Sequence, residues 1–192
     1  MCILVVIGFY SPTALAIWDN ANIGPYNVSF DLDTTSEYNI GDPEFVEFSQ
    51  YDCWAFRILD SEYRFLINME LHDFQNPTSI DADYLKDHLT KSGFLASSMY
   101  ERVDYQILEI DGNDGILAVA DTGDEDVYYF AYSPDEWDSY GQTVVLTECI
   151  ATWKITNNLL DSLNVEGFNE PKIDLSFDSV IMPPAGGFIS SS

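Results

Sequence analysis

Two histidines, His72 and His88, are the only side chains in this sequence whose ordinary pKa lies near neutral pH. His88 falls within a predicted helix, one turn after Tyr84, where a histidine is most often solvated. His72 ends a predicted strand. Nucleophilic catalysis would need one of them beside an activated serine, but the sequence contains no Gly-x-Ser-x-Gly elbow. We therefore predict no catalytic residues and a protein that is not an enzyme.

The cysteines offer either a disulfide or free thiols. Removal of a signal peptide would take Cys2 and leave Cys53 and Cys149, an even pair that allows a disulfide in an exported protein. Both lie in strand-like runs, where a buried free thiol is equally ordinary. With His72 and His88 they would supply four zinc ligands by number. No two of the four have the short spacing of a zinc motif, so the sequence does not favour zinc.

Two predicted hairpin loops concentrate hard oxygen ligands of the kind that calcium prefers. The candidate ligands in these loops are Asp111, Asn113, Asp114, Asp121, Asp124 and Asp126. Neither loop matches the helix-loop-helix calcium motif. The two loops are joined by one predicted strand, so they would lie at its opposite ends, too far apart to share an ion. Asp-Gly sequences are also what tight hairpins use. Calcium is the one cofactor that we consider, bound by each loop alone or with acids from elsewhere.

Other residues suggest surface roles. The 33 acidic residues allow a carboxylate pair for acid and base catalysis, as in glycoside hydrolysis, but their abundance singles out no pair. Trp137 and Tyr140 lie in an acidic loop, and we expect them to be exposed and to contact a partner, although Trp137 would equally fold back over the sheet edge. Asn27 begins a glycosylation sequon inside a predicted strand, a less favourable place for modification than a loop.

The net charge of −26 restricts the partners. Nucleic-acid binding depends on neutralising phosphates with Lys and Arg, of which the chain has only seven, and an anionic membrane surface would be repelled for the same reason. Divalent cations and protein partners are compatible with this surface. At physiological salt the mean repulsion between the charges is largely screened, so the acidity is compatible with a folded domain.

Alternating apolar residues predict strands, which cover residues 26–32, 45–48, 53–59, 63–71, 103–107, 116–120, 127–132 and 143–150. Asp81 is expected to cap a helix that runs to about Ser92, and a second helix covers about 152–163. Strands, a helix, a strand meander and a second helix predict an α+β domain. We expect an antiparallel sheet with both helices packed on one face.

The two ends of the chain are predicted to lie outside this domain. Residues 1–16 combine an apolar run too short to span a membrane with a small-x-small cleavage pattern, which predicts a signal peptide, although no basic residue precedes the run. A buried first strand is the alternative. Residues 17–166 form the single predicted domain. Residues 167–192 form a tail rich in Pro, Gly and Ser, with one added strand as an option at 173–177.

In the order of its predicted strands and helices, the chain resembles the PsbP/Mog1-like fold over roughly residues 24–166. The resemblance rests on Gly24 to Phe30 as the first strand, on the helix after the strand pair, on the hairpin at Ile110 to Gly112, and on the ending Asn158 to Val165. These motifs are more similar to exported archaeal proteins of methanogen type than to the plant members of the fold. The resemblance implies a binding or assembly role, and it implies no catalytic residues because the fold has no shared active site.

These observations lead to one expected function and two alternatives. We expect a non-catalytic, exported, acidic module that binds a protein or another component at the cell envelope. One alternative is an extracellular hydrolase that uses two carboxylates. The other is a structural domain stabilised by calcium.

Overall fold

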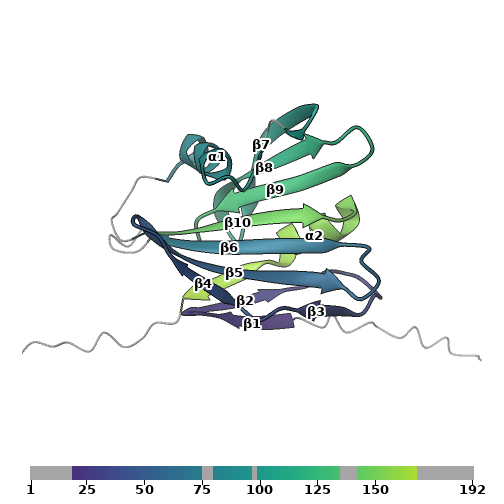
Figure 1. Cartoon of the computed structure of the whole chain (residues 1–192), viewed down its shortest axis with the longest axis horizontal. Helices are drawn as coiled ribbons and strands as arrows, with labels where there is room; N and C mark the ends of the chain where they lie inside the picture. Colours follow the sequence, from purple (N-terminus) through teal and green to yellow (C-terminus); the bar gives the residue numbers. More distant parts are fainter. Residues whose placement is uncertain (1–18, 75–79, 97–98, 135–141, 168–192) are drawn as a thin grey trace, which may run out of the picture.

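The computed structural model describes residues 19–74, 80–96, 99–134 and 142–167. It contains two antiparallel sheets and two helices, so the predicted α+β class is confirmed (Figure 1). The predicted signal peptide and most of the predicted tail lie outside the described residues. No described helix is both long and apolar enough to cross a membrane.

The larger sheet has eight strands and carries most of the structure. In chain order its strands are β3 (Tyr38–Ile40), β4 (Glu44–Glu47), β5 (Tyr51–Asp60), β6 (Leu66–Phe74), β7 (Arg102–Ile110), β8 (Asn113–Asp121), β9 (Asp126–Tyr132) and β10 (Gln142–Ile150). Their spatial order is β3-β5-β6-β10-β9-β8-β7, and β4 also pairs with β5, beyond β3 along the same edge. The centre of this sheet is therefore the pairing of β6 with β10.

A smaller sheet of three strands brings the two ends of the domain together. Its strands are β1 (Asp19–Ile23), β2 (Tyr26–Phe30) and β11 (Asn164–Gly167), in the order β1-β2-β11. Val28 on β2 lies opposite Val165 on β11, and both are buried. β11 extends to the start of the predicted tail, so the last strand of the domain is bonded to one of its first.

The helices form where the sequence predicts them. Helix α1 spans Ala82–Lys91, and its first turn is capped by Asp81, whose carboxylate accepts a hydrogen bond from the Tyr84 N–H. Gly93 follows with a φ of +83°, a left-handed conformation that ends the helix. Helix α2 spans Trp153–Ser162.

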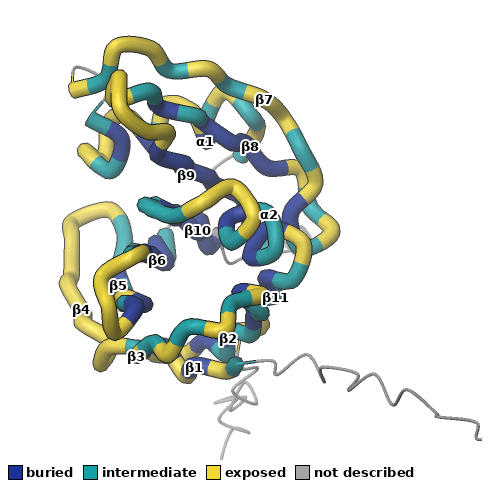
Figure 2. Tube along the Cα trace, turned by 90° about the vertical axis from the view of Figure 1, so that its right-hand side faces the viewer, coloured by how far each residue is buried: buried dark blue, intermediate teal, exposed yellow. Residues whose placement is uncertain are grey.

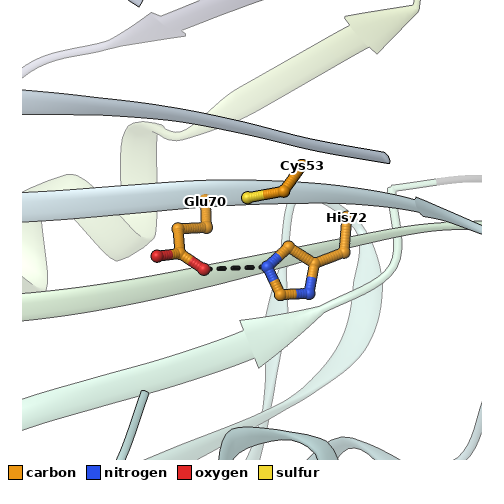
Figure 3. A group of neighbouring side chains, drawn as sticks. All are labelled: Cys53, Glu70 and His72. Carbon is orange, nitrogen blue, oxygen red and sulfur yellow. Dashed lines mark hydrogen bonds and ion pairs between the residues drawn. The ribbon is translucent and has the colours of Figure 1, made fainter. Parts of the chain in front are cut away.

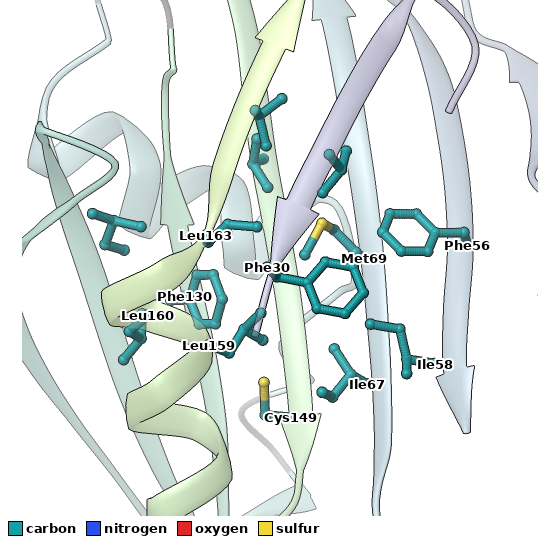
Figure 4. Close-up of a cluster of buried hydrophobic side chains, with 14 of the residues drawn as sticks. Phe30, Phe56, Ile58, Ile67, Met69, Phe130, Cys149, Leu159, Leu160 and Leu163 are labelled. Carbon is teal, nitrogen blue, oxygen red and sulfur yellow. The ribbon is translucent and has the colours of Figure 1, made fainter. Parts of the chain in front are cut away.

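The helices cover opposite faces of the large sheet, so the expectation that both pack on one face is wrong. Along β9, Phe130 joins the core that contains Leu159 and Leu160 of α2, whereas Tyr129 joins the core that contains Leu85 and Leu89 of α1. Figure 4 shows the α2 core, in which β2 of the small sheet also packs. β8 and β9 have consecutive buried residues, so they are buried on both faces, and each apolar face needs its own cover.

Candidate metal centre

Three side chains of different chemistry meet on the α1 face of the sheet, at the pairing of β5 with β6. Cys53 on β5 lies directly opposite His72 on β6, and Glu70 precedes His72 by two residues, which places all three on the same face. One ligand atom of each lies within 4.8 Å of the other two (Figure 3). Among the described residues, no other group of three or more His, Cys, Asp and Glu side chains gathers in this way.

His72 is held at both ring nitrogens. Its Nε2 lies 2.8 Å from Glu70 Oε2, and its Nδ1 lies 2.8 Å from Nε2 of His88, which reaches the sheet from α1. The imidazole of His72 is almost fully buried, whereas Glu70 retains a third of its exposure. The prediction that His88 is solvated is wrong, because α1 turns this residue towards the sheet.

Aromatic rings enclose the two histidines. Tyr51 stacks on His72 with ring centres 4.3 Å apart, and Tyr84 stacks on His88 at 5.7 Å. Phe74 meets the edge of His88 at 5.3 Å. These ring contacts hold the two imidazoles in place beside Cys53 and Glu70.

Burial sets the protonation states of the site. Desolvation, with a smaller contribution from the nearby His72, lowers the pKa of His88 to about 4, so His88 is neutral at physiological pH. Desolvation, together with the Glu70 carboxylate, raises the pKa of Cys53 to about 12. Without a metal, Cys53 is therefore a thiol and a poor nucleophile.

The donor set suits zinc better than calcium. Sulfur and imidazole nitrogen are zinc ligands, whereas calcium takes oxygen ligands. Zinc lies about 2.0 to 2.3 Å from such ligands, so ligand atoms around one ion are roughly 3.5 Å apart. All three donors lie within 4.8 Å of one another, and holding one ion would need small shifts: Glu70 Oε2, 2.8 Å from His72 Nε2, would move slightly away from it. If His72 held a metal through Nε2, its proton would have to lie on Nδ1, and the neutral His88 would be placed to accept the hydrogen bond from that N–H.

A cavity of about 540 Å³ adjoins this centre on the same face of the sheet. Glu70 belongs to both, and its carboxylate connects the metal ligands to the cavity wall. The rest of the lining comes from the loop before β4, from β4, β5, β6 and β10, and from the segment that follows α1.

The predicted calcium residues occupy the two hairpins at the ends of β8, as expected. Asp111 is partly buried and has a φ of +53°. Its Oδ2 accepts a hydrogen bond from the Val165 N–H at 3.0 Å, and the Tyr132 hydroxyl lies 3.4 Å away. The Asn113 amide donates to the carbonyl of Asp111, so this first loop is held by its own turn contacts.

In the second hairpin, Asp121 accepts a hydrogen bond from the Gly123 N–H, which closes the turn. Asp114 of the first hairpin is exposed, as are Asp124 and Asp126 of the second. No three carboxylates of these loops gather within the distance that unites Cys53, Glu70 and His72.

Of the two alternatives for the cysteines, the structure has the free thiols, because Cys53 and Cys149 are both unbonded and buried. Cys149 lies opposite Ile67 on β6, in the α2 core, and Cys53 lies opposite His72 on the α1 face. The sheet itself separates the two sulfur atoms, so no rotation of the side chains brings them together.

The other residues predicted from the sequence, the partner contacts and the glycosylation site, lie away from this centre or outside the described residues. Trp137 and Tyr140, the predicted partner contacts, lie outside the described residues. Asn27 lies on β2, the middle strand of the small sheet, and is partly buried, so its use as a glycosylation site stays a prediction. Comparison with known proteins adds no assignment, since no family model, curated protein or solved structure matches the chain.

Proposed function

We propose that the chain is an exported, non-catalytic binding module whose ligand is a divalent transition-metal ion, with zinc the best fit. The observation that carries the proposal is the gathering of Cys53, Glu70 and His72 within 4.8 Å, with His72 oriented by His88. Donors of this kind match zinc chemistry in type, and they leave one of the four positions around zinc to another ligand. Burial and the raised pKa of the Cys53 thiol oppose nucleophilic catalysis, and zinc binding would require this thiol to lose its proton.

Two further expectations from the sequence, the PsbP/Mog1-like fold and export to the cell envelope, are proposals as well. The order of strands, helix, meander and helix supports the resemblance to the PsbP/Mog1-like fold. Export to the cell envelope is supported by the apolar run and cleavage pattern at residues 1–16. A metal-binding module outside the cell would agree with the acidic surface, which concentrates cations around it.

Binding of zinc and cobalt to the purified protein tests the metal centre. We expect one ion per chain by calorimetric titration, and a thiolate-to-cobalt charge-transfer band in the near ultraviolet when cobalt replaces zinc. Cys53→Ser and His72→Ala should each lose the ion. Cys149→Ala is the matched control, because it removes the buried thiol on the other face of the sheet and should keep both signals. Equal loss in Cys53→Ser and Cys149→Ala, or no binding by the unaltered protein, would refute the proposal.

A hydrolase is the second candidate, and the cavity beside the metal ligands favours it. Three protein ligands leave zinc one position for water, the composition typical of catalytic sites, and Glu70 connects that centre to a wall rich in carboxylates. Incubation of the zinc-loaded protein with chromogenic esters, peptides and glycosides tests this candidate. Turnover that Cys53→Ser abolishes and Cys149→Ala preserves would favour the hydrolase over a binding module.

A further inference from the structure

β4 is an exposed outer edge of the large sheet, and none of its four residues is buried (Figure 2). β5 pairs with one side of β4, and within the described part of the chain no strand pairs with the other side. The apolar residues Phe45, Val46 and Phe48 are 49%, 47% and 44% exposed. An exposed apolar edge of this kind is a template to which a further strand can add.

The backbone of β4 has free hydrogen-bonding groups at defined residues. At the closed end of the β4–β5 hairpin, the Phe48 N–H donates to the Tyr51 carbonyl at 3.0 Å. Bonded and non-bonded pairs alternate along an antiparallel ladder, so Val46 also bonds to β5, whereas Phe45 and Glu47 direct their N–H and C=O groups outwards. A strand added outside β4 would bond to Phe45 and Glu47.

The same edge borders the cavity beside the metal centre, and this cavity is acidic. Four carboxylates line it, those of Asp42, Glu44, Glu70 and Glu148. Arg57 is the one basic residue in this lining. Asn68 Oδ1, also at the cavity wall, is buried and accepts no hydrogen bond from the described residues, so an entering donor would find an acceptor there.

We infer that β4 binds an extended segment of a partner protein in which basic residues flank apolar ones. The inference goes beyond metal binding and does not depend on it. Alternate side chains of the added strand would project on the cavity face, where Glu44 lies, and a Lys or Arg there meets the carboxylates. Apolar side chains of the same segment cover Phe45 and Val46, and its other basic residues pair with Glu47.

The negative charge of the chain favours a basic partner segment at β4 over a second copy of the chain and over the chain's own C-terminal residues. A second copy of the chain would bring Glu44 and Glu47 of two acidic edges together, and each copy carries a net charge of −26. The chain's own residues 168–192 contain an apolar segment, but they hold three acidic residues and a single Lys. A basic partner gains from the two carboxylates of the cavity that lie at this edge, Asp42 and Glu44.

Amide exchange of the full chain, followed by NMR with and without a probe, tests the inference. The probe is a blocked peptide with Lys-Val-Val-Lys repeats, and its matched control has Glu in place of each Lys. We expect the amides of Phe45 and Glu47 to exchange fast in the protein alone and to be protected by the Lys probe only. Protection without a probe would overturn the inference. If that protection rises with protein concentration, a second copy covers β4, and if it does not, the chain's own tail does.

Variants separate the backbone contribution from the charge. Glu47→Pro removes an outward N–H and should weaken probe binding about fivefold or more, since one hydrogen bond contributes about 1 kcal/mol. Glu47→Gln keeps that N–H, so it should bind more tightly than Glu47→Pro. Glu44→Gln should weaken binding about threefold, the value of an exposed ion pair, and Glu109→Gln on the exposed face of β7 should not. Equal affinity in Glu47→Pro and Glu47→Gln, or an equal effect of Glu44→Gln and Glu109→Gln, would refute strand addition at this cavity.

Discussion

At the scale of single residues, the candidate metal centre depends on contacts that no sequence motif describes. Cys53, Glu70, His72 and His88 come from two strands and a helix, so their spacing along the chain carries no zinc pattern. One pattern could have indicated part of the centre, namely Glu70 and His72 at alternate positions of a strand, which places them on one face. The pairing of Cys53 with His72 depends on the register of β5 with β6, which the sequence does not reveal.

His88 is a positioning residue in the proposed centre, because it contacts His72 and is not one of the three candidate ligands. His88→Ala should weaken zinc binding by about 10- to 100-fold, the usual effect of losing the group that orients a metal-binding histidine. His88→Gln keeps a side chain that can bond to His72 Nδ1 and should restore much of the affinity. Competition with a chromogenic chelator measures both. If the two variants bind zinc equally, His88 acts only through packing.

Asp111 gives a prediction about pH. Burial raises its pKa above 3.8, although the hydrogen bond from the Val165 N–H opposes the change, so folding favours the protonated form. The stability that this group contributes is complete below pH 3.8 and is lost as the pH rises through the raised pKa. Asp111→Asn should therefore raise the stability at neutral pH and change it little in acid. Asn also tolerates the left-handed backbone at this position.

The same variant tests the calcium hypothesis. Thermal melting of both proteins, with calcium and with a chelator, is the measurement. A calcium-stabilised hairpin at Asp111 requires a melting temperature that rises by several degrees with calcium in the unaltered protein and does not rise in Asp111→Asn. If both proteins melt alike with calcium and with chelator, this hairpin binds no calcium.

At the scale of elements, the strongest patterns predicted the structure well and the weak ones failed. Both helices and the strands of the meander lie close to the predicted ranges, because their apolar periodicity is long and regular. β1, β3 and β11 were not predicted. They have three to five residues each, and they are strands because a partner strand pairs with them, which the local sequence does not show.

The packing of both helices on one face was predicted wrongly for a related reason. Period-2 alternation identifies two faces but not which of them is solvated. In β8 and β9, consecutive residues such as Leu117 and Ala118 are both fully buried, on opposite faces of the sheet. Runs of this kind indicate a strand covered on both sides, and they were available in the sequence.

The turn between β1 and β2 gives a prediction for how the small sheet packs on the large one. Gly24 has a φ of +58°, and a Cβ there would lie 2.3 Å from a ring carbon of Trp54 on β5. Gly24→Ala should cost about 2 to 4 kcal/mol from backbone strain and overpacking together. Gly93→Ala is the control, since φ is also positive there but the space is open, and it should cost about 1 to 2 kcal/mol. Urea unfolding measures both. Equal losses of unfolding free energy in the two variants would show that the Trp54 ring moves aside without cost.

At the scale of the whole molecule, the excess of acidic residues predicts how salt acts on stability. Repulsion among like charges opposes the compact state, and it weakens as the Debye length falls from about 30 Å at 0.01 M to about 8 Å at 0.15 M salt. We expect the free energy of unfolding in urea to rise with NaCl over this range and to change little beyond it. A stability that stays flat below 0.15 M would show that the charges are already compensated in pairs.

The pairing of β6 with β10 at the centre of the large sheet has a consequence for the order of folding. β5 and β6 form a hairpin early in the chain, but the strand that completes the pairing of β6 follows only after α1, β7, β8 and β9. Contacts this distant in sequence slow folding, because a long loop must close before they stabilise the structure. A route that delivers the chain with its N-terminus first therefore leaves the edge of β6 open until β10 arrives, and the two halves of the sheet join last at its middle.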